Sequence, residues 1–431
     1  MTFRVIHEPT AKARTMDAYI TGLNARSILD SRGNPTVEVD CFVNGSLAGR
    51  AAVPSGASTG SHEAVELRDG GNRWMGKGVD KAVENVIETI QDALVGLRVD
   101  DQTTIDQCIL DLDDTPNKAK IGANATLGAS MACLHAGATV HSQPLWRYIG
   151  GLSGGCLPVP LMNIINGGAH ATSDVDVQEF MVVPHGFDSF PEALRAGVET
   201  YHSLKSVLKE RGLLGGIGDE GGFAPNLPSN ETGLGLLSEA IERAGYSPGE
   251  EIGIALDVAA QEFLYDDGYH IDGAVLNGEQ LVETYARWAD EHPIISIEDP
   301  FGEDDWKSWA SLTREIGDQV QIVGDDLFVT NVNRLSDGIE RRSANAILIK
   351  PNQIGTITET LECIEMAKSN GFGTIMSHRS GETSDNTIAD LAVGSRTGQI
   401  KTGAPARSDR TSKYNQLLRI SETCGEFLPP Y

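Results

Sequence analysis

The stretch EIGIALD, residues 251–257, is the first of six short apolar runs that end abruptly in an ionisable side chain. The others are PIISIED (293–299), QIVGDD (321–326), NAILIK (345–350), GTIMSHRS (373–380) and GQIKTG (398–403). Their terminal polar residues follow one another at gaps of 41, 27, 25, 28 and 23 residues and are Asp257, Glu298, Asp325, Lys350, His378 and Lys401. This spacing suits one strand, one helix and two loops, the repeating unit of a parallel barrel. Because chemistry in such barrels gathers at the carboxyl ends of the strands, we expect these six side chains to share one mouth.

The barrel opens irregularly. LPVPLMNIINGG (157–168) and DVQEFMVVPHG (176–186) are strand-like runs with no room between them for a crossover helix, so we predict that they pair antiparallel. Residues 188–211 then have the pattern of a helix. The fold class is therefore α/β, a variant TIM-like (β/α)8 barrel that opens with an antiparallel strand pair and occupies residues 153–431.

A smaller α+β domain is predicted to precede the barrel, over residues 18–152. TVEVDCFV (36–43) alternates polar and apolar residues, and the hairpin signal Asn44-Gly45 leads into a returning strand. Helical patterns follow at residues 79–94 and 122–142. The Gly- and Pro-rich segment 148–160 indicates the domain boundary, and residues 1–17 are expected to form a flexible N-terminal arm.

The charge, hydrophobic content and cysteine spacing of the chain argue against several classes of protein. The chain has 431 residues, 40% of them hydrophobic, and a formal charge of −27, which argues against general nucleic-acid binding. It contains no apolar stretch of the length that a membrane span requires. Six scattered cysteines form no Cys-x-x-Cys pair, so we interpret them as reduced thiols of a cytosolic protein: Cys41, Cys108, Cys133, Cys156, Cys363 and Cys424.

Three of the strand-end acids, Asp257, Glu298 and Asp325, favour a metal site. Singly, such acids more often cap helices, but three in succession offer the oxygen ligands that Mg²⁺ prefers, without cysteine or histidine at zinc-like spacing. A lysine beside a bound divalent cation should have a lowered pKa, which would make Lys350 or Lys401 a competent base. Either lysine could instead simply reach solvent.

Further candidates lie on the loops near the mouth. Glu179 and Glu220 could share one proton and donate it to a leaving group, and His170 follows two glycines nearby. Arg379 and Ser380, directly after His378, suit a phosphate because a planar guanidinium can grip two oxygens.

Two short motifs are set aside. Residues 216–221 satisfy the dinucleotide pattern G-x-G-x-x-G, but they follow a helix, and Asp219 and Glu220 would repel a pyrophosphate. Residues 56–60 satisfy the hydrolase pattern G-x-S-x-G, but Pro54 and the hairpin domain do not supply the strand–turn–helix that this elbow needs. A mobile loop whose hydroxyl closes over a ligand is the better interpretation.

The motifs together resemble the enolase family, of bacterial type. Between about Ala25 and Ile420 they follow the family's order: SRGNPTVEV, VPSGASTG, INGGAH, QEFM, GDEGG, SIEDP, GDDL, LIKPNQIGT, SHRSGET and GQIKTGAPAR. The resemblance implies a cytoplasmic glycolytic lyase that interconverts 2-phosphoglycerate and phosphoenolpyruvate with two Mg²⁺ ions. It also implies a homodimer or octamer, and it leaves open a second pool at the cell surface or secreted.

The resemblance also implies roles for individual residues. Lys350 would remove the C2 proton, and Glu220, assisted by Glu179, would protonate the departing hydroxyl. One Mg²⁺ would be held by Asp257, Glu298 and Asp325, and Ser58 would help to bind the second. His170 is implied to take part in catalysis, and the implied contacts to substrate are made by His170, Glu179, Glu298, Asp325, Lys350, His378, Arg379, Ser380 and Lys401.

Departures from the family pattern lie away from these residues, although Pro351 follows the base lysine directly and Gln261 replaces a commoner serine. Two other functions are kept as alternatives. The first is a superfamily dehydratase or racemase acting on another acid, which Arg379 and Ser380 disfavour. The second is a non-catalytic scaffold or surface-binding protein, which would not need every chemical group to be present.

Overall fold

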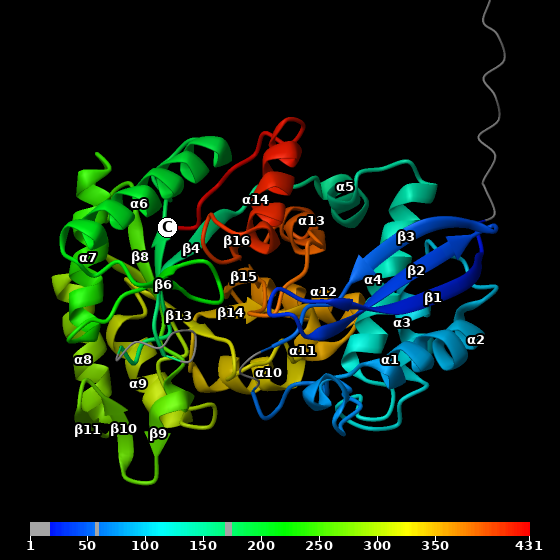
Figure 1. The fold of residues 1–431 in the computed structure, drawn as a ribbon, viewed down its shortest axis with the longest axis horizontal. Helices are drawn as coiled ribbons and strands as arrows, with labels where there is room; N and C mark the ends of the chain where they lie inside the picture. Colours follow the sequence, from blue (N-terminus) through cyan, green and yellow to red (C-terminus); the bar gives the residue numbers. More distant parts are fainter. Residues whose placement is uncertain (1–17, 57–59, 169–174) are drawn as a thin grey trace, which may run out of the picture.

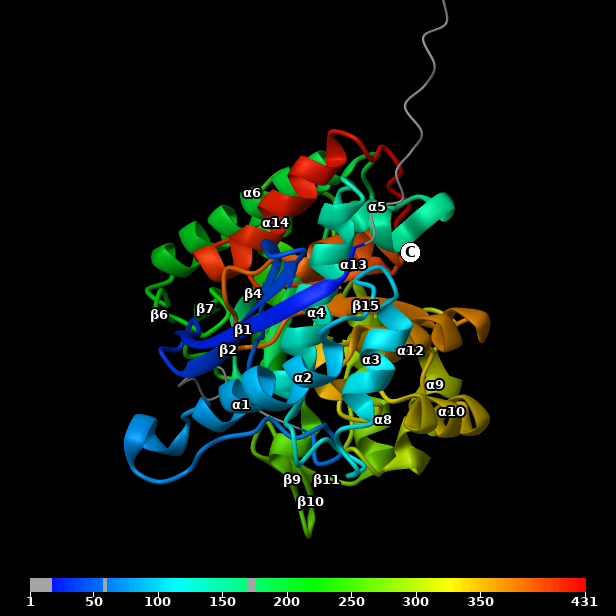
Figure 2. The same ribbon diagram turned by 90° about the vertical axis from the view of Figure 1, so that its right-hand side faces the viewer.

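The computed structural model describes residues 18–56, 60–168 and 175–431. The predicted arm at residues 1–17 and the candidate residues Ser58 and His170 lie outside the described residues. A small N-terminal domain lies beside a larger barrel, and the two pack side by side (Figures 1 and 2). The arrangement confirms the predicted fold class.

The N-terminal domain is built on an antiparallel sheet of three strands, β1 (Ile20–Leu29), β2 (Pro35–Val43) and β3 (Ser46–Ala52). The predicted hairpin between β2 and β3 is confirmed. Asn44 and Gly45 both have positive φ, 51° and 80°, which matches the twist of a two-residue hairpin. Strand β1 was not predicted, because only part of its length alternates between buried and exposed residues.

Helices cover this sheet. The predicted segment 79–94 is one helical stretch with a π-helical centre, formed by α1 (Asp80–Glu84), η2 (Asn85–Ile90) and α2 (Gln91–Leu94). Helix α4 (Ala123–Val140) is buried against β2 and β3, and its small residues allow the close approach. The domain is completed by η1 (Arg73–Gly76), α3 (Gln102–Leu110), α5 (Leu145–Gly150) and η3 (Gly151–Ser153).

The barrel is closed by the pairing of its last strand, β16, with its first, β4. The predicted antiparallel opening is confirmed, because β5 runs antiparallel to both β4 and β8 while the other neighbours are parallel. The eight barrel strands are β4 (Val159–Asn166), β5 (Glu179–Val183), β8 (Gly253–Asp257), β12 (Ile294–Glu298), β13 (Gln321–Gly324), β14 (Ala346–Ile349), β15 (Gly373–Ser377) and β16 (Gly398–Lys401).

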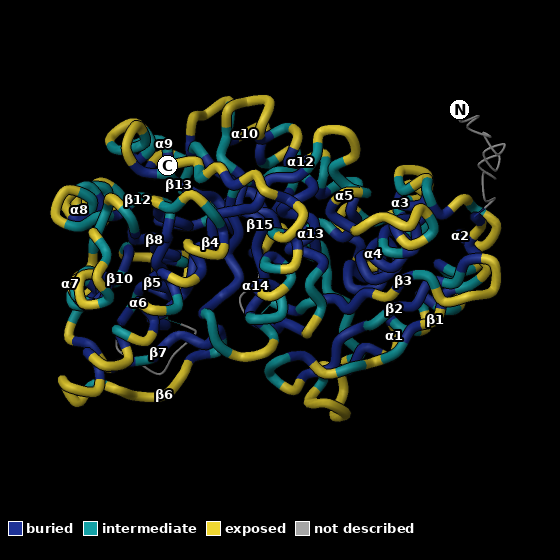
Figure 3. The backbone as a smooth tube through the Cα atoms, turned by 90° about the horizontal axis from the view of Figure 1, so that it is seen from above, coloured by how far each residue is buried: buried dark blue, intermediate teal, exposed yellow. Residues whose placement is uncertain are grey.

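The barrel helices form an outer ring around a buried sheet (Figure 3). After the two opening strands come two helices, and then strand and helix alternate to the end. The helices are α6 (Phe190–Glu210), α7 (Asn230–Arg243), α8 (Gly278–Glu291), α9 (Trp306–Ile316), α10 (Val332–Arg341), α11 (Pro351–Ile354), α12 (Ile357–Ser369), α13 (Thr387–Gly394) and α14 (Ser408–Ser421).

The loops of the barrel contain several short strands and a short 3-10 helix. They are β6 (Gly216–Ile217), β7 (Phe223–Ala224), η5 (Ala260–Phe263), β9 (Leu264–Tyr265), β10 (Gly268–Ile271) and β11 (Ala274–Leu276). The glycine-rich segment 216–221 thus belongs to a small hairpin rather than to the start of a helix.

Buried hydrogen bonds join the two domains. The Asp106 carboxylate on α3 accepts from the backbone N–H of Thr358 at 2.8 Å, and the Ser130 hydroxyl accepts from that of Ile357 at 3.0 Å. Both donors lie in the first turn of α12, so the N-terminal domain caps a barrel helix. In the part of the chain that the structure describes, no helix has the length and apolar character needed to cross a membrane.

Candidate active site

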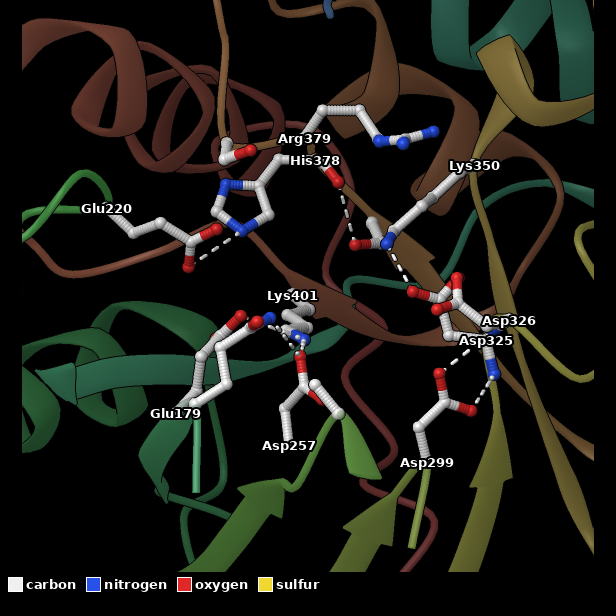
Figure 4. Close-up of a pocket in the computed structure, with 14 residues that line it drawn as sticks. Glu179, Glu220, Asp257, Asp299, Asp325, Asp326, Lys350, His378, Arg379 and Lys401 are labelled. Carbon is white, nitrogen blue, oxygen red and sulfur yellow. Dashed lines mark hydrogen bonds and ion pairs between the residues drawn. The ribbon is translucent and has the colours of Figure 1, made fainter. Parts of the chain in front are cut away.

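The side chains that end the six apolar runs gather at the carboxyl rim of the barrel. Asp257, Glu298 and Lys401 are the last residues of β8, β12 and β16. Asp325, Lys350 and His378 are the first residues after β13, β14 and β15. Five of the six line one pocket (Figure 4), and Glu298 contacts Lys401 beside it.

Two glutamates complete this rim. Glu179 is the first residue of β5, and it reaches the same rim because β5 runs antiparallel, so that it pairs with Asp257 in register. Glu220 comes from the loop of the β6–β7 hairpin and points into the pocket opposite Lys350 (Figure 4). The antiparallel opening therefore has a direct consequence for the site, since a parallel β5 would place Glu179 at the far end.

Lys401 is the centre of a buried ionic cluster. Its Nζ lies 2.8 Å from Asp257 Oδ2, 2.8 Å from Glu298 Oε2 and 3.2 Å from Glu179 Oε1. Burial raises the pKa of Glu179 and of Glu298 well above the ordinary range, and neighbouring carboxylates raise both further. The pKa of Lys401 is also raised, since the surrounding acids outweigh the burial of its charge. The cluster therefore places three carboxyl groups around one amine.

Lys350 pairs with Asp325, whose other oxygen accepts from Gln353 Nε2 at 2.8 Å. Burial opposes the charged form of both partners, yet the pKa of Asp325 lies below and that of Lys350 above its ordinary value because each stabilises the other's charge. The lowered pKa expected for Lys350 applies beside a bound divalent cation and stays a prediction. Asp325 would no longer hold the proton on Lys350 if it were engaged with such a cation.

Pro351 fits its position without strain. Lys350 is the N-cap of helix α11 and has extended backbone angles, φ −123° and ψ 103°, while Pro351 occupies the first helical position. The missing N–H costs nothing there, because the first N–H groups of a helix have no partner within it. The extended backbone of Lys350 is the conformation that a following proline favours.

A second acidic group adjoins this pair. Carboxylate oxygens of Asp299, Asp325 and Asp326 lie within 4.8 Å of one another. Burial raises the pKa of Asp299 and raises that of Asp326 to about 8, with neighbouring carboxylates adding to both. Asp299 and Asp325 are buried and Asp326 is half-buried, and the two Asp299 oxygens accept from the backbone N–H groups of Asp325 and Asp326. Closely spaced carboxylate oxygens are the ligands that a hard cation such as Mg²⁺ prefers, so these residues fit a magnesium site.

Arg379 forms an ion pair with a residue of the N-terminal domain. Its guanidinium is buried and donates to Glu63 at 2.9 Å and to the Asn352 side-chain oxygen at 3.0 Å. Glu63 follows Ser58 closely in the sequence, so the smaller domain contributes a carboxylate that pairs with a residue lining the pocket. Ser380 is also buried and lines the pocket.

His378 lies beside Glu220. Its Nε2 is 3.4 Å from Glu220 Oε2, and Asn163 Nδ2 donates to the same carboxylate at 3.1 Å. Burial lowers the pKa of His378 to about 3, and the positive charges of Arg410 and Lys401 act in the same direction while Glu220 opposes them. The imidazole is therefore neutral at physiological pH.

Sequence reasoning missed several side chains of the site. Asp299 and Asp326 each directly follow a predicted ligand, so the doublets Glu-Asp and Asp-Asp at the strand ends could have indicated them. Glu63, Asn163 and Arg410 carry no such signal, because they approach from other elements of the fold.

Two family models match the chain. Residues 20–149 match the N-terminal domain of enolase, and residues 155–428 match its C-terminal TIM barrel domain. The chain belongs to the enolase family. The matched order, a capping domain followed by the barrel, is the architecture described above, and the carboxyl rim of this enolase-type barrel carries the cluster of acids, lysines and histidine.

Proposed function

We propose that this protein catalyses the reversible, magnesium-dependent dehydration of 2-phosphoglycerate to phosphoenolpyruvate, a step of glycolysis and gluconeogenesis. The observation that carries the proposal is the placement of Lys350 and Glu220 on opposite sides of one pocket (Figure 4). An elimination needs a base on one side of the substrate and an acid beside the leaving group. Membership of the enolase family supports the same reaction.

The proposed reaction balances with the groups present. Lys350 takes the proton from C2, a double bond forms between C2 and C3, and the C3–O bond breaks. Glu220, assisted by Glu179, gives its proton to the departing hydroxyl, which leaves as water. Both proton-transfer groups line the same pocket, with Glu220 buried and Lys350 half-buried.

Other side chains would bind the negatively charged groups of the substrate. Lys401 would contact the carboxylate, where negative charge grows as the C2 proton leaves, and Arg379 with Ser380 would hold the phosphate. His378 would line the site, as would His170, which lies outside the described residues. Arg379 presents two nitrogens to acceptors already, which suits bidentate recognition.

Asp257, Glu298 and Asp325 would hold the first Mg²⁺ and Ser58 would take part in binding the second, with Asp299 and Asp326 close by. Bound cations would supply positive charge to the substrate oxygens on which negative charge develops. Family membership further supports a cytoplasmic homo-oligomer, a dimer or an octamer, which light scattering on the purified protein would distinguish.

The test is turnover of 2-phosphoglycerate, followed by the ultraviolet absorbance of the enol product with Mg²⁺ and with chelator. K350A and E220Q should each lower kcat by orders of magnitude while circular dichroism stays unchanged. Lys368, an exposed lysine on α12, provides the control variant K368A, which should keep wild-type turnover. Near-normal turnover of K350A or E220Q would remove the role assigned to that residue, and a panel of acids without phosphate would reveal a different substrate.

A further inference from the structure

Arg410 is a fully buried arginine in the first turn of α14, close to the site but outside the proposed reaction. A positive charge in that turn opposes the helix dipole, and burying a charge is costly unless it is fully paired. Nη1 and Nη2 are accordingly directed at acceptors, while Nε forms an ion pair without an aligned hydrogen bond. Nη1 donates to the carbonyl of Arg379 at 2.6 Å, Nη2 to that of Ser380 at 2.7 Å, and Nε lies 2.8 Å from the Asp409 carboxylate.

The remaining contact of Arg410 determines the state of a histidine. Nη1 lies 2.5 Å from His378 Nδ1. A guanidinium has only donors and stays protonated, so His378 Nδ1 must supply the lone pair. A neutral imidazole that accepts at Nδ1 carries its proton on Nε2, and that buried nitrogen lies 3.4 Å from Glu220 Oε2 without an aligned hydrogen bond in the resting structure. The other charged group near the ring is Lys401, which, like Arg410, disfavours a positive imidazole.

We propose that Arg410 is a positioning residue that fixes the Nε2–H tautomer of His378 and thereby aims one N–H donor at Glu220. The tautomer is a property of the resting protein, and only its consequence rests on the proposed function. When Glu220 gives its proton to the leaving hydroxyl it becomes a carboxylate, and the N–H of His378 stabilises that new charge. The opposite tautomer carries its proton on Nδ1. It would place the Nε2 lone pair against the Glu220 carboxylate, and its Nδ1–H would face the N–H of Arg410 Nη1.

The tautomer is tested directly by ¹⁵N NMR of the histidine rings in the full-length protein without substrate. The chain has ten histidines, and the spectrum of H378Q identifies the signals of His378. We expect Nε2 to resonate as a protonated nitrogen and Nδ1 as an unprotonated one, and we expect R410M to convert this pattern to a tautomer mixture. A protonated Nδ1 in the wild type overturns the proposal, as does an unchanged pattern in R410M. This result does not depend on which reaction the protein catalyses.

The kinetic consequence is tested with R410M, R410K and the control R419M, which removes an exposed arginine from the same helix. R410M should lower kcat about tenfold, the loss expected for one hydrogen bond to a developing charge. The acid limb of its pH profile should also move to higher pH, because protonation of His378 is no longer opposed by the guanidinium. R410K should restore part of kcat, and R419M should match wild type. A loss that is uniform across pH overturns the positioning role.

A third test compares H378Q with H378N and keeps the proposal testable if R410M does not fold. In H378Q the amide nitrogen can lie near the place of Nε2 and donate to Glu220. In H378N it lies near Nδ1, where it would meet the donors of Arg410. We therefore expect H378Q to retain at least tenfold more turnover than H378N, and the reverse order overturns the assignment. If the wild type itself does not turn over 2-phosphoglycerate, the proposed function fails while the NMR result still decides the tautomer.

Discussion

Replacing Asp390 by asparagine is expected to stabilise the folded protein at neutral pH. Asp390 lies on α13 with its side chain buried against α5 and α14. Its carboxylate accepts from the backbone N–H of Trp146 at 3.1 Å and from Gln416 Nε2 at 2.9 Å, and no cation is among these partners. Burial raises its pKa from 3.8 to about 6, and the nearby Asp385 charge adds to the effect.

The magnitude follows from linkage between protonation and folding. The folded state binds the proton more tightly than the unfolded chain, so the stability that Asp390 contributes is full below pH 3.8 and is lost as pH rises through about 6. The difference between the two pKa values corresponds to about 3 kcal/mol at pH 8. Asparagine avoids this cost, but it rearranges one of the two hydrogen bonds at a cost of about 1 kcal/mol. D390N should therefore be about 2 kcal/mol more stable than wild type at pH 8.

Urea denaturation of both proteins at pH 4.5 and pH 8 (values chosen on either side of the titration) measures this difference. The gain should be large at pH 8 and should vanish at pH 4.5, where the carboxyl is neutral in the folded state but still largely ionised in the unfolded chain, so that only about 1 kcal/mol of the cost remains and the weakened hydrogen bond offsets it. D318N, the same change at an exposed position, should show no pH-dependent gain. A gain of equal size at both pH values would refute the reasoning, because it would not arise from ionisation of Asp390.

Three further outcomes are expected. G49A should destabilise the N-terminal domain by about 3 kcal/mol in thermal or urea unfolding, since the added Cβ would lie 2.1 Å from the Ala132 carbonyl oxygen on α4. D106A should cost about 2 kcal/mol by the same measurements, because it removes a buried carboxylate that accepts from a half-buried N–H at the start of α12. Mg²⁺ at a hundredfold excess over its dissociation constant should stabilise the protein by about 2.7 kcal/mol, and chelator should abolish the rise in melting temperature; an unchanged melting temperature would exclude a site on the folded state.

Much of the barrel could be predicted because strand ends in a parallel barrel are constrained by topology. Each apolar run forms one strand. Closure of the barrel brings the residues at the carboxyl ends of these strands to one rim, whatever the length or conformation of the connecting loops. The short link between the first two strands also fixed the direction of β5, and with it the placement of Glu179 at that rim. Helix ends were harder to predict, and β1 was missed because its burial pattern is irregular.

The rest of the site depends on contacts between distant parts of the chain. Glu63 meets Arg379 across 316 positions, and Arg410 meets His378 across 32, with no local pattern that pairs them. Both pairs are buried, so each is specified by packing of one element on another rather than by periodicity. The protonation of Lys350 cannot be read from sequence alone either, because it depends on which partner Asp325 holds.

The charge of the pocket explains how so acidic a protein could bind an anion. The described residues of the rim include Glu179, Asp257, Asp299, Asp325 and Asp326 among the acids, and burial forces several of them either to keep a proton or to share a cation. Three basic side chains, on Lys350, Lys401 and Arg379, are already paired with acids of the chain. Under the proposed function, an incoming phosphate and carboxylate would have to compete for these basic groups. Divalent ions bound to the acids would release the basic groups toward the substrate, so the proposal predicts that anion binding depends on magnesium.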